Sequence, residues 1–160
     1  LLPFVRHTGP ALSAFNAWVL VKSLETLSMR VNKMNESAQQ IAEFLAEQPK
    51  VNSVNYPGLK SHSGYEIAQK QMTGAGTTLS FEIAGGSKEL FKVMDALKVI
   101  DISNNLGDSK SLITHPASTT HRRLDQATRE SMGITDSLGR LSVGLEHSSD
   151  LIKDLQQALR

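Results

Sequence analysis

The sequence contains no cysteine, and aromatic residues make up only 5% of its 160 residues. Without cysteine the chain can form no disulfide, no thiolate nucleophile and no cysteine-based zinc site. Such a composition fits a reducing compartment, and we expect the protein to be cytoplasmic. Hydrophobic residues make up 39% and charged residues 21%, which is the composition of a globular domain.

The chain also lacks a long apolar run and a strong charge of either sign. Its longest apolar run, residues 17–21, is far shorter than the roughly 18 residues needed to cross a bilayer. The formal net charge of +1 does not supply the broad basic surface that grips nucleic acid or anionic lipid. We therefore expect no membrane partner and no nucleic-acid partner.

What the chain does contain is, first, a long helical segment. Pro10 suits the first turn of a helix, and no further proline or glycine follows until Pro49. Apolar residues at spacings of three and four predict one buried stripe, formed by Leu27, Val31, Met34, Ala38, Ile41 and Leu45. Whether one helix or two forms is left open, with Ser23 and Thr26 as the candidate break points.

Residues 49–160 alternate between short strands and helices. Strands are expected in VNSVN, TTLSFEI, VIDIS and RLSVGLE, and helices in SGYEIAQKQM, SKELFKVMDAL, RRLDQATRESMG and SSDLIKDLQQAL. Ser87 is expected to cap the second of these helices, and Gly133 to end the third. Because the strands are half-polar, we expect helices on one face of a small sheet and a second face that is wet or covers something.

The stretch NNLGDSKSLITHPASTTH, residues 104–121, is polar and has too little apolar periodicity for an ordinary core element. We expect a loop or an irregular strand there. Its first half could bind an anion through backbone N–H groups, or be a solvent loop rich in turn-forming residues. The spacing of His115 and His121 suits no shared metal site, which favours loop histidines that hydrogen-bond the backbone.

Arg140 opens the expected strand RLSVGLE and lies, by alternation, on the face opposite Leu141 and Val143. A guanidinium at a strand tip can hold a planar carboxylate with two parallel N–H donors. The pattern alone favours a plainer interpretation, a solvated surface arginine with a nearby glutamate partner. His62 is expected to be a loop residue, and no Ser-His-Asp order or HExxH motif occurs.

Four segments in order resemble one family, the pyridoxal-phosphate (PLP) enzymes of cysteine and methionine metabolism, which include the cystathionine synthases and lyases. The segments are GPALSAFNAWVLVKSLETLSMR (9–30), VNSVNYPGLKSHSGYEIAQKQMTGAGTTLSFEIAGG (51–86), LGDSKSLITHPASTTH (106–121) and RLSVGLEHSSDLIKDLQQAL (140–159). The resemblance covers nearly the whole chain, and the order of the motifs makes it specific. The stretch at 104–121 looks most like that of the O-succinylhomoserine or O-acetylhomoserine sulfhydrylases.

The resemblance implies the C-terminal domain of an aspartate-aminotransferase-like, fold type I PLP enzyme. The expected fold class is α/β (α+β), with a small, mainly antiparallel sheet, helices on one face and a long helical segment in front. Residues 1–48 would be an interdomain helical segment and residues 49–160 the C-terminal small domain. The N-terminal domain with the PLP cofactor and its Schiff-base lysine would be absent, so we expect this fragment alone to be inactive.

In the family, the loop that matches residues 104–121 lies over the active site. By this resemblance Asn105 and Arg140 would bind the α-carboxylate of the substrate, although many relatives have serine where this chain has Asn105. Four further residues would support the loop without reacting: Leu106, Gly107, Thr120 and His121. No catalytic residue and no metal ligand is expected within this chain.

The implied reaction of the intact protein is γ-replacement, in which O-succinyl- or O-acetylhomoserine and sulfide give homocysteine for methionine biosynthesis. Cystathionine γ-synthase and methionine or cystathionine γ-lyase are the alternatives, and a cofactor-free binding module is an alternative of another class. The expected partners are the protein's own N-terminal PLP domain, a small amino-acid substrate and, by family resemblance, further copies in a homotetramer. Phe15, Trp18 and Val19 would pack on the missing domain or on a neighbouring subunit.

Overall fold

The computed structural model describes residues 1–8 and 12–160, so the helix start expected at Pro10 lies outside the described residues. The chain divides into two compact units, Leu1–Arg30 and Val31–Arg160. The expected domain division at residue 48 stays a prediction. Among the described helices, none combines the length and the hydropathy of a membrane span.

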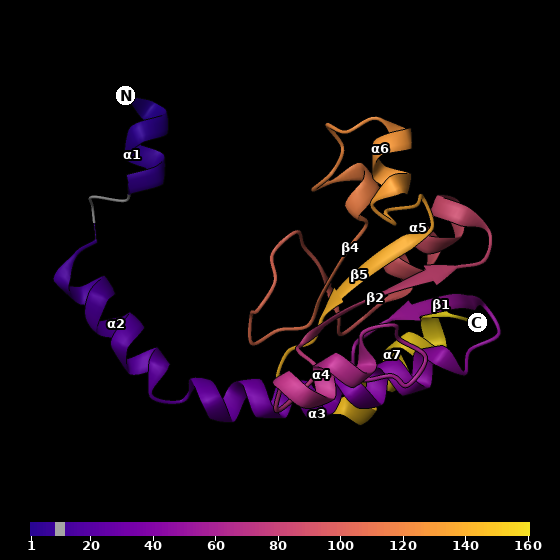
Figure 1. The fold of residues 1–160 in the computed structure, drawn as a ribbon, viewed down its shortest axis with the longest axis horizontal. Helices are drawn as coiled ribbons and strands as arrows, with labels where there is room; N and C mark the ends of the chain where they lie inside the picture. The colour runs from indigo at the N-terminus through magenta and orange to yellow at the C-terminus, as the bar shows by residue number, and fades with distance from the viewer. Residues whose placement is uncertain (9–11) are drawn as a thin grey trace. The chain divides into compact units, whose positions relative to one another are not determined.

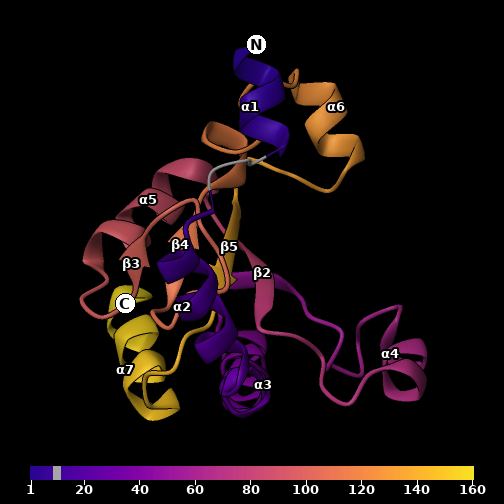
Figure 2. The same cartoon turned by 90° about the vertical axis from the view of Figure 1, so that its left-hand side faces the viewer.

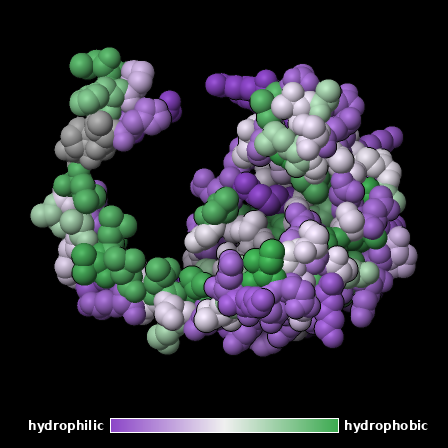
Figure 3. All heavy atoms as spheres, in the orientation of Figure 1, coloured by the Kyte–Doolittle hydropathy of each residue, from purple (hydrophilic) through white to green (hydrophobic). Residues whose placement is uncertain are grey.

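The first unit contains two short helices and the start of a third. α1 spans Leu2–Thr8 and α2 spans Ala14–Leu24. Ser13 caps α2, because its hydroxyl accepts the N–H of Asn16 at 3.2 Å. The structure describes every residue of α2, and none of them is buried. Figure 3 shows hydrophobic surface along this helix.

The long helical segment is broken where α2 ends and α3, Leu27–Ala46, begins. Glu25 and Thr26 form a turn there, so two helices form, next to the candidate break points. The first members of the predicted stripe, Leu27 and Val31, are not buried. The other members are buried as predicted: Met34, Ala38, Ile41 and Leu45.

The second unit is built on a five-stranded sheet in the order β1-β2-β5-β4-β3 (Figure 1). The strands are β1 Val51–Asn55, β2 Thr78–Ile83, β3 Asp101–Ile102, β4 Leu112–Thr114 and β5 Leu138–Ser142. In the described part of the chain β3 pairs with β4 in parallel, and the other pairings are antiparallel. The predicted small, mainly antiparallel sheet is confirmed.

Three helices cover one face of this sheet: α3, α5 (Gly86–Ala96) and α7 (Ser148–Ala158). In Figure 2, α5 and α7 lie together on one side of the strands. Their apolar sides and the inward residues of the strands form one core, which includes Ile41, Leu45, Leu79, Phe81, Ile83, Leu90, Ile113, Leu141, Val143, Leu151 and Leu155. The remaining short elements are α4 (Tyr65–Gln71), the 3-10 helix η1 (Pro116–Ser118) and α6 (Gln126–Ser131).

Two local expectations need correction. The stretch at 104–121 contains a short strand, β4, which is one of the two expected forms, but it also contributes to the core, because β4 lies inside the sheet and residues 111–117 are all buried. A strand that is buried on both faces shows no apolar alternation. Ser87 is not the cap of α5, which instead follows Gly85 in a left-handed conformation with φ 99°. Gly133, with φ 73°, does end α6 as predicted.

Candidate functional site

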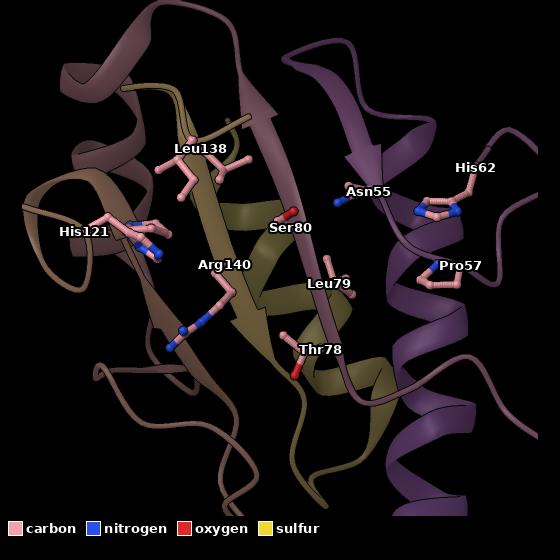
Figure 4. A pocket seen from close by; sticks show the side chains of 11 residues that line it. Asn55, Pro57, His62, Thr78, Leu79, Ser80, His121, Leu138 and Arg140 are labelled. Atoms are coloured by element: carbon pink, nitrogen blue, oxygen red, sulfur yellow. The ribbon is translucent and has the colours of Figure 1, made fainter. Parts of the chain in front are cut away.

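The face of the sheet opposite the helices carries a hollow of about 330 Å³ (Figure 4). Strands β2 and β5 form its floor, and the segments that follow β1 and η1 form its walls. The residues that line it are Asn55, Pro57, His62, Thr78, Leu79, Ser80, Pro116, His121, Ile134, Leu138 and Arg140. A concave site with a few converging polar groups is the usual form of a small-molecule site.

A row of polar residues crosses this face of the sheet. Asn55 of β1 pairs with Ser80 of β2, Ser80 pairs with Arg140 of β5, and Arg140 pairs with Thr114 of β4. Residues that pair directly across strands project to the same face, and neighbouring strands lie about 4.8 Å apart. The row therefore leads across the hollow, and Arg140 is its one charged member.

Arg140 lies in the middle of β5, which begins at Leu138, and not at a strand tip as predicted. Its side chain is half-buried. Among the described residues no acidic group forms an ion pair with it, so the glutamate partner of the plainer interpretation is not found. A cation without a carboxylate partner is thus available at the hollow.

Two main-chain carbonyls hold one nitrogen of the Arg140 guanidinium. Its Nη2 donates to the carbonyl oxygen of Asn104 at 2.8 Å and to that of Asn105 at 3.3 Å. Its Nε is buried and has no partner in the described chain. Carbonyl oxygens carry only partial negative charge, so the cation keeps donors and charge for an anionic group.

The loop that receives Arg140 is fixed by main-chain contacts. The N–H of Asn105 donates to Ser103 Oγ at 3.3 Å, and the N–H of Gly107 donates to Ser142 Oγ at 2.9 Å. Gly107 has φ 77°, which glycine adopts without steric cost. Leu106 is 60% exposed. The predicted site residues Asn105 and Arg140 are thus adjacent, and the carboxylate-binding role of the Asn105 side chain stays a prediction.

The alternative of an anion-binding turn at 104–110 loses support from the same loop. The carboxylate of Asp108 accepts the N–H of Lys110 at 3.3 Å and the hydroxyl of Ser109 at 3.1 Å. Both bonds lower the pKa of Asp108, and the bond from the Lys110 N–H has the larger effect. A side-chain carboxylate of the chain itself therefore occupies this turn.

Thr120 and His121 lie together at the end of the motif. Thr120 Oγ1 is 2.9 Å from His121 Nδ1, and the main-chain N–H of His121 donates to the carbonyl of Pro116 at 2.9 Å. Thr120 is exposed, whereas His121 lines the hollow on the same side as Arg140 (Figure 4). Their predicted part in orienting the loop stays a prediction.

His115 is buried, and both of its ring nitrogens have a hydrogen-bond partner within the chain. It is 4% exposed, and its Nδ1 lies 2.8 Å from Ser118 Oγ while its Nε2 lies 3.1 Å from the carbonyl oxygen of Asp136. Because a carbonyl only accepts, Nε2 carries the hydrogen. The rings of Phe91 and His115 also pack in a T-shaped arrangement, with centroids 4.9 Å apart. Among residues 1–8 and 12–160 no cluster of three possible metal ligands occurs, and His115 bonds the backbone as the favoured interpretation proposes.

His62, Asn55 and Ser80 line the hollow although the sequence did not single them out as site residues. His62 Nδ1 accepts the N–H of Gly64 at 2.9 Å, which leaves the hydrogen of the neutral ring on Nε2. Their common location follows from the register of β1 with β2 and from the fold of the next loop. Neither leaves a signal in local sequence.

Tyr56 anchors the wall that carries His62. Its side chain is buried, and its hydroxyl donates to the carbonyl of Gly76 at 2.9 Å. Burial, and then the charge of Glu43, raise the pKa of Tyr56 to about 12. The hydroxyl therefore stays a hydrogen-bond donor across the physiological pH range.

The sequence matches the family model described as Cys/Met metabolism PLP-dependent enzyme over residues 2–160. It is 53% identical over 159 residues to an O-succinylhomoserine sulfhydrylase of Mycobacterium tuberculosis. The aligned region covers 97% of this chain and 39% of that protein. An L-methionine gamma-lyase of Fusobacterium nucleatum is 44% identical over 95% of this chain and 38% of its own length. The chain thus spans about two fifths of the length of the curated relatives it matches.

Two solved structures resemble this chain in both fold and sequence. The metY protein of Campylobacter jejuni, assigned as an O-acetylhomoserine (thiol)-lyase and solved with a pyridoxyl-lysine phosphate, aligns with TM-score 0.91 and 41% identity over 99% of this chain and 38% of that one. The metB protein of Corynebacterium glutamicum aligns with TM-score 0.86 and 38% identity over 98% of this chain and 40% of that one. The chain therefore belongs to the family of Cys/Met metabolism PLP-dependent enzymes.

Proposed function

We propose that this chain is the C-terminal part of a PLP-dependent enzyme that converts O-succinyl- or O-acetylhomoserine and sulfide to homocysteine in the cytoplasm. Its own task is to bind the α-carboxylate of the substrate through Arg140, with Asn105 beside it. The observation that carries this proposal is the half-buried Arg140, which has no acidic partner in the described chain and lines the hollow. The identities of 53% and 44% to O-succinylhomoserine sulfhydrylases support the choice of reaction.

The residues of this chain fit a carboxylate better than they fit the cofactor. The described residues that line the hollow include no lysine to bind an aldehyde carbon and no glycine-rich cradle for a phosphate. We assign the cofactor and its lysine to another region of the intact protein. When bound, PLP supplies the electron sink of the reaction, and no reaction step is assigned to residues of this chain.

Positioning is the contribution expected from Arg140. A guanidinium that grips a carboxylate with parallel donors fixes the orientation of the substrate as well as its location. Correct orientation of a substrate can supply a large share of a rate enhancement. Binding and rate should therefore both depend on this one side chain.

The test is Arg140→Ala in the full-length protein. Arg140→Lys is the matched variant, because it keeps the positive charge but loses the two parallel N–H donors of the guanidinium. We expect Arg140→Ala to raise KM for the homoserine ester about 10- to 100-fold and to lower kcat, because a desolvated carboxylate loses its partner. Both esters should be assayed for homocysteine. A change within about twofold in both parameters would refute the assigned role.

A γ-lyase is the second candidate, because an L-methionine gamma-lyase of Fusobacterium nucleatum is 44% identical to this chain. A lyase would release an α-keto acid and ammonia from its amino-acid substrate without sulfide, whereas the proposed enzyme needs sulfide and gives homocysteine. Cystathionine γ-synthase would take cysteine in place of sulfide. Product analysis with each sulfur donor separates the three.

The proposal also includes a partner for the first unit. Phe15 and Trp18 are 68% and 58% exposed, and we propose that they pack on the PLP domain or on a neighbouring copy in a tetramer. Borohydride reduction of the native protein, followed by mass spectrometry, tests the arrangement. A pyridoxyl-lysine outside this chain supports it, and a native chain without label would favour the cofactor-free binding module.

A further inference from the structure

Asn104, the residue next to the predicted carboxylate ligand Asn105, is held from the side by a buried hydroxyl. Thr114 Oγ1 donates to Asn104 Oδ1 at 2.9 Å and lies 3.0 Å from Thr119 Oγ1. Thr119 Oγ1 in turn donates to the carbonyl of His115 at 2.7 Å. Thr114 itself is 1% exposed, so its hydroxyl is buried, whereas its acceptor Asn104 lies on the exposed loop.

The same Asn104 contacts Arg140 through its main chain. Its carbonyl oxygen accepts Nη2 of Arg140 at 2.8 Å. Thr114 and Arg140 are also direct cross-strand partners on β4 and β5. The hydroxyl of Thr114 thus fixes the side chain of the residue whose carbonyl fixes the guanidinium.

The far end of this loop is fixed independently. Gly107 donates its N–H to Ser142 Oγ at 2.9 Å, and Ser142 is fully buried on β5. Between the two attachment points the carbonyls of Asn104 and Asn105 both face Arg140. The loop is thus attached to β4 through Asn104 and to β5 through Gly107, and its carbonyls hold the guanidinium beside the hollow.

We propose that Thr114 and Asn104 are positioning residues for Arg140, an inference that rests on the proposed function. A free arginine loses rotamer entropy when it engages a carboxylate, and this loss weakens binding. Here one nitrogen is already held by the loop carbonyls, so the remaining donors meet the substrate in a fixed direction. The hydroxyl of Thr114 acts on substrate binding through Arg140 and without touching the substrate.

The experiment compares Thr114→Val, which removes the hydroxyl at nearly constant shape, with Thr114→Ser, which restores it. In the full-length enzyme Thr114→Val should raise KM for the homoserine ester about five- to tenfold and lower kcat less than Arg140→Ala does. Thr114→Ser should recover the KM of the parent. Calorimetric binding of L-norvaline, which has an α-carboxylate but no leaving group, should weaken by the same factor.

The matched control is Thr135→Val. Thr135 donates to Glu82 Oε1 at 2.6 Å and lies 3.1 Å from Ser137 Oγ. The variant therefore loses a similar hydrogen-bond network, but one that does not include Arg140. Its KM should not change. If Thr114→Val is too unstable to assay, Asn104→Ala on the exposed loop tests the same link.

A double-mutant cycle with Arg140→Ala distinguishes the two levels of inference. Adding Thr114→Val to Arg140→Ala should raise KM no further, because the arginine it positions is gone. If Arg140→Ala raises KM while Thr114→Val and Asn104→Ala leave it within twofold, the positioning role is wrong and the proposed function stands. If Arg140→Ala itself leaves KM unchanged, the proposed function fails, and the positioning role fails with it.

Discussion

The two faces of the sheet are supplied by the same strands but differ in what their side chains can do. In β2, Leu79, Phe81 and Ile83 point into the core and are nearly fully buried, while Thr78 and Ser80 line the hollow. The period of two along a strand makes this division possible within a few residues. Substitutions on the covered face should therefore change stability, and substitutions on the open face should change binding.

The largest expected effect comes from the covered face. Phe81→Ala removes a side chain that is 0% exposed in the core, and we expect a loss of about 3–5 kcal/mol in the free energy of unfolding. Part of this is lost transfer energy and part is the cavity left behind. Urea denaturation of the chain, followed by circular dichroism, measures it.

Phe15→Ala is the control for this change, because Phe15 is 68% exposed in the first unit. It should change the free energy of unfolding by less than about 0.5 kcal/mol. Equal losses in the two variants would mean that the exposed helix contributes to the core as much as β2 does. The comparison of covered and exposed positions would then be wrong.

A smaller loss is expected where α7 meets the segment between α5 and β3. The carboxylate of Asp154, which is 4% exposed, accepts the N–H groups of Lys98, Val99 and Ile100 at 2.8, 2.8 and 3.0 Å. Asp154→Asn replaces one acceptor oxygen by a donor, so at neutral pH we expect a loss of about 2–3 kcal/mol. Denaturation at several pH values measures it.

The pH dependence of this loss has a definite sign. Burial acts to raise the pKa of Asp154, but the backbone donors outweigh it and lower the pKa. The stabilisation is therefore fully present above the unfolded-state pKa of about 3.9 and is lost as the pH falls through the lower folded-state value. The difference between the parent and Asp154→Asn should shrink in that acidic window. Asp150→Asn, on the exposed side of α7, should show neither effect beyond about 0.5 kcal/mol.

The sequence predicts the covered face better than the open one. Strong alternation identifies β2, and the recurrence of apolar residues identifies the buried side of α3 from Met34 onward, because both patterns are local. The sequence does not identify β4 as a core strand, because a short strand that is buried on both faces has no alternation of apolar and polar residues. Ser87 misleads as a cap because Gly85 and Gly86, at φ 99° and 75°, already start α5.

The open face combines residues from distant parts of the chain, so local patterns identify only some of them. Family resemblance singles out Arg140, Asn105 and His121. Asn55, His62 and Ser80 reach the same hollow only through strand register and the course of the loop after β1. The hydrogen bond from Thr114 to Asn104 depends likewise on the loop returning beside β4.

The smallest effect on stability is expected at Ser80, on the open face. Ser80 is a neighbour of Arg140 across the strands, and none of the described residues hydrogen-bonds its hydroxyl. Ser80→Leu should change the free energy of unfolding by less than about 0.5 kcal/mol. It would fill part of the hollow, so we expect a KM about tenfold higher in the full-length enzyme, corresponding to about 1.4 kcal/mol of lost binding.

Ser53→Leu is the matched substitution, because Ser53 lies on β1, is exposed and does not line the hollow. Its KM should equal that of the parent. If Ser80→Leu left KM unchanged while Arg140→Ala raised it, the substrate would contact Arg140 from another direction than the hollow. If instead Ser80→Leu lost several kcal/mol of stability, the open face would be part of the core. The separation of roles between the two faces would then fail at Ser80, the cross-strand neighbour of Arg140.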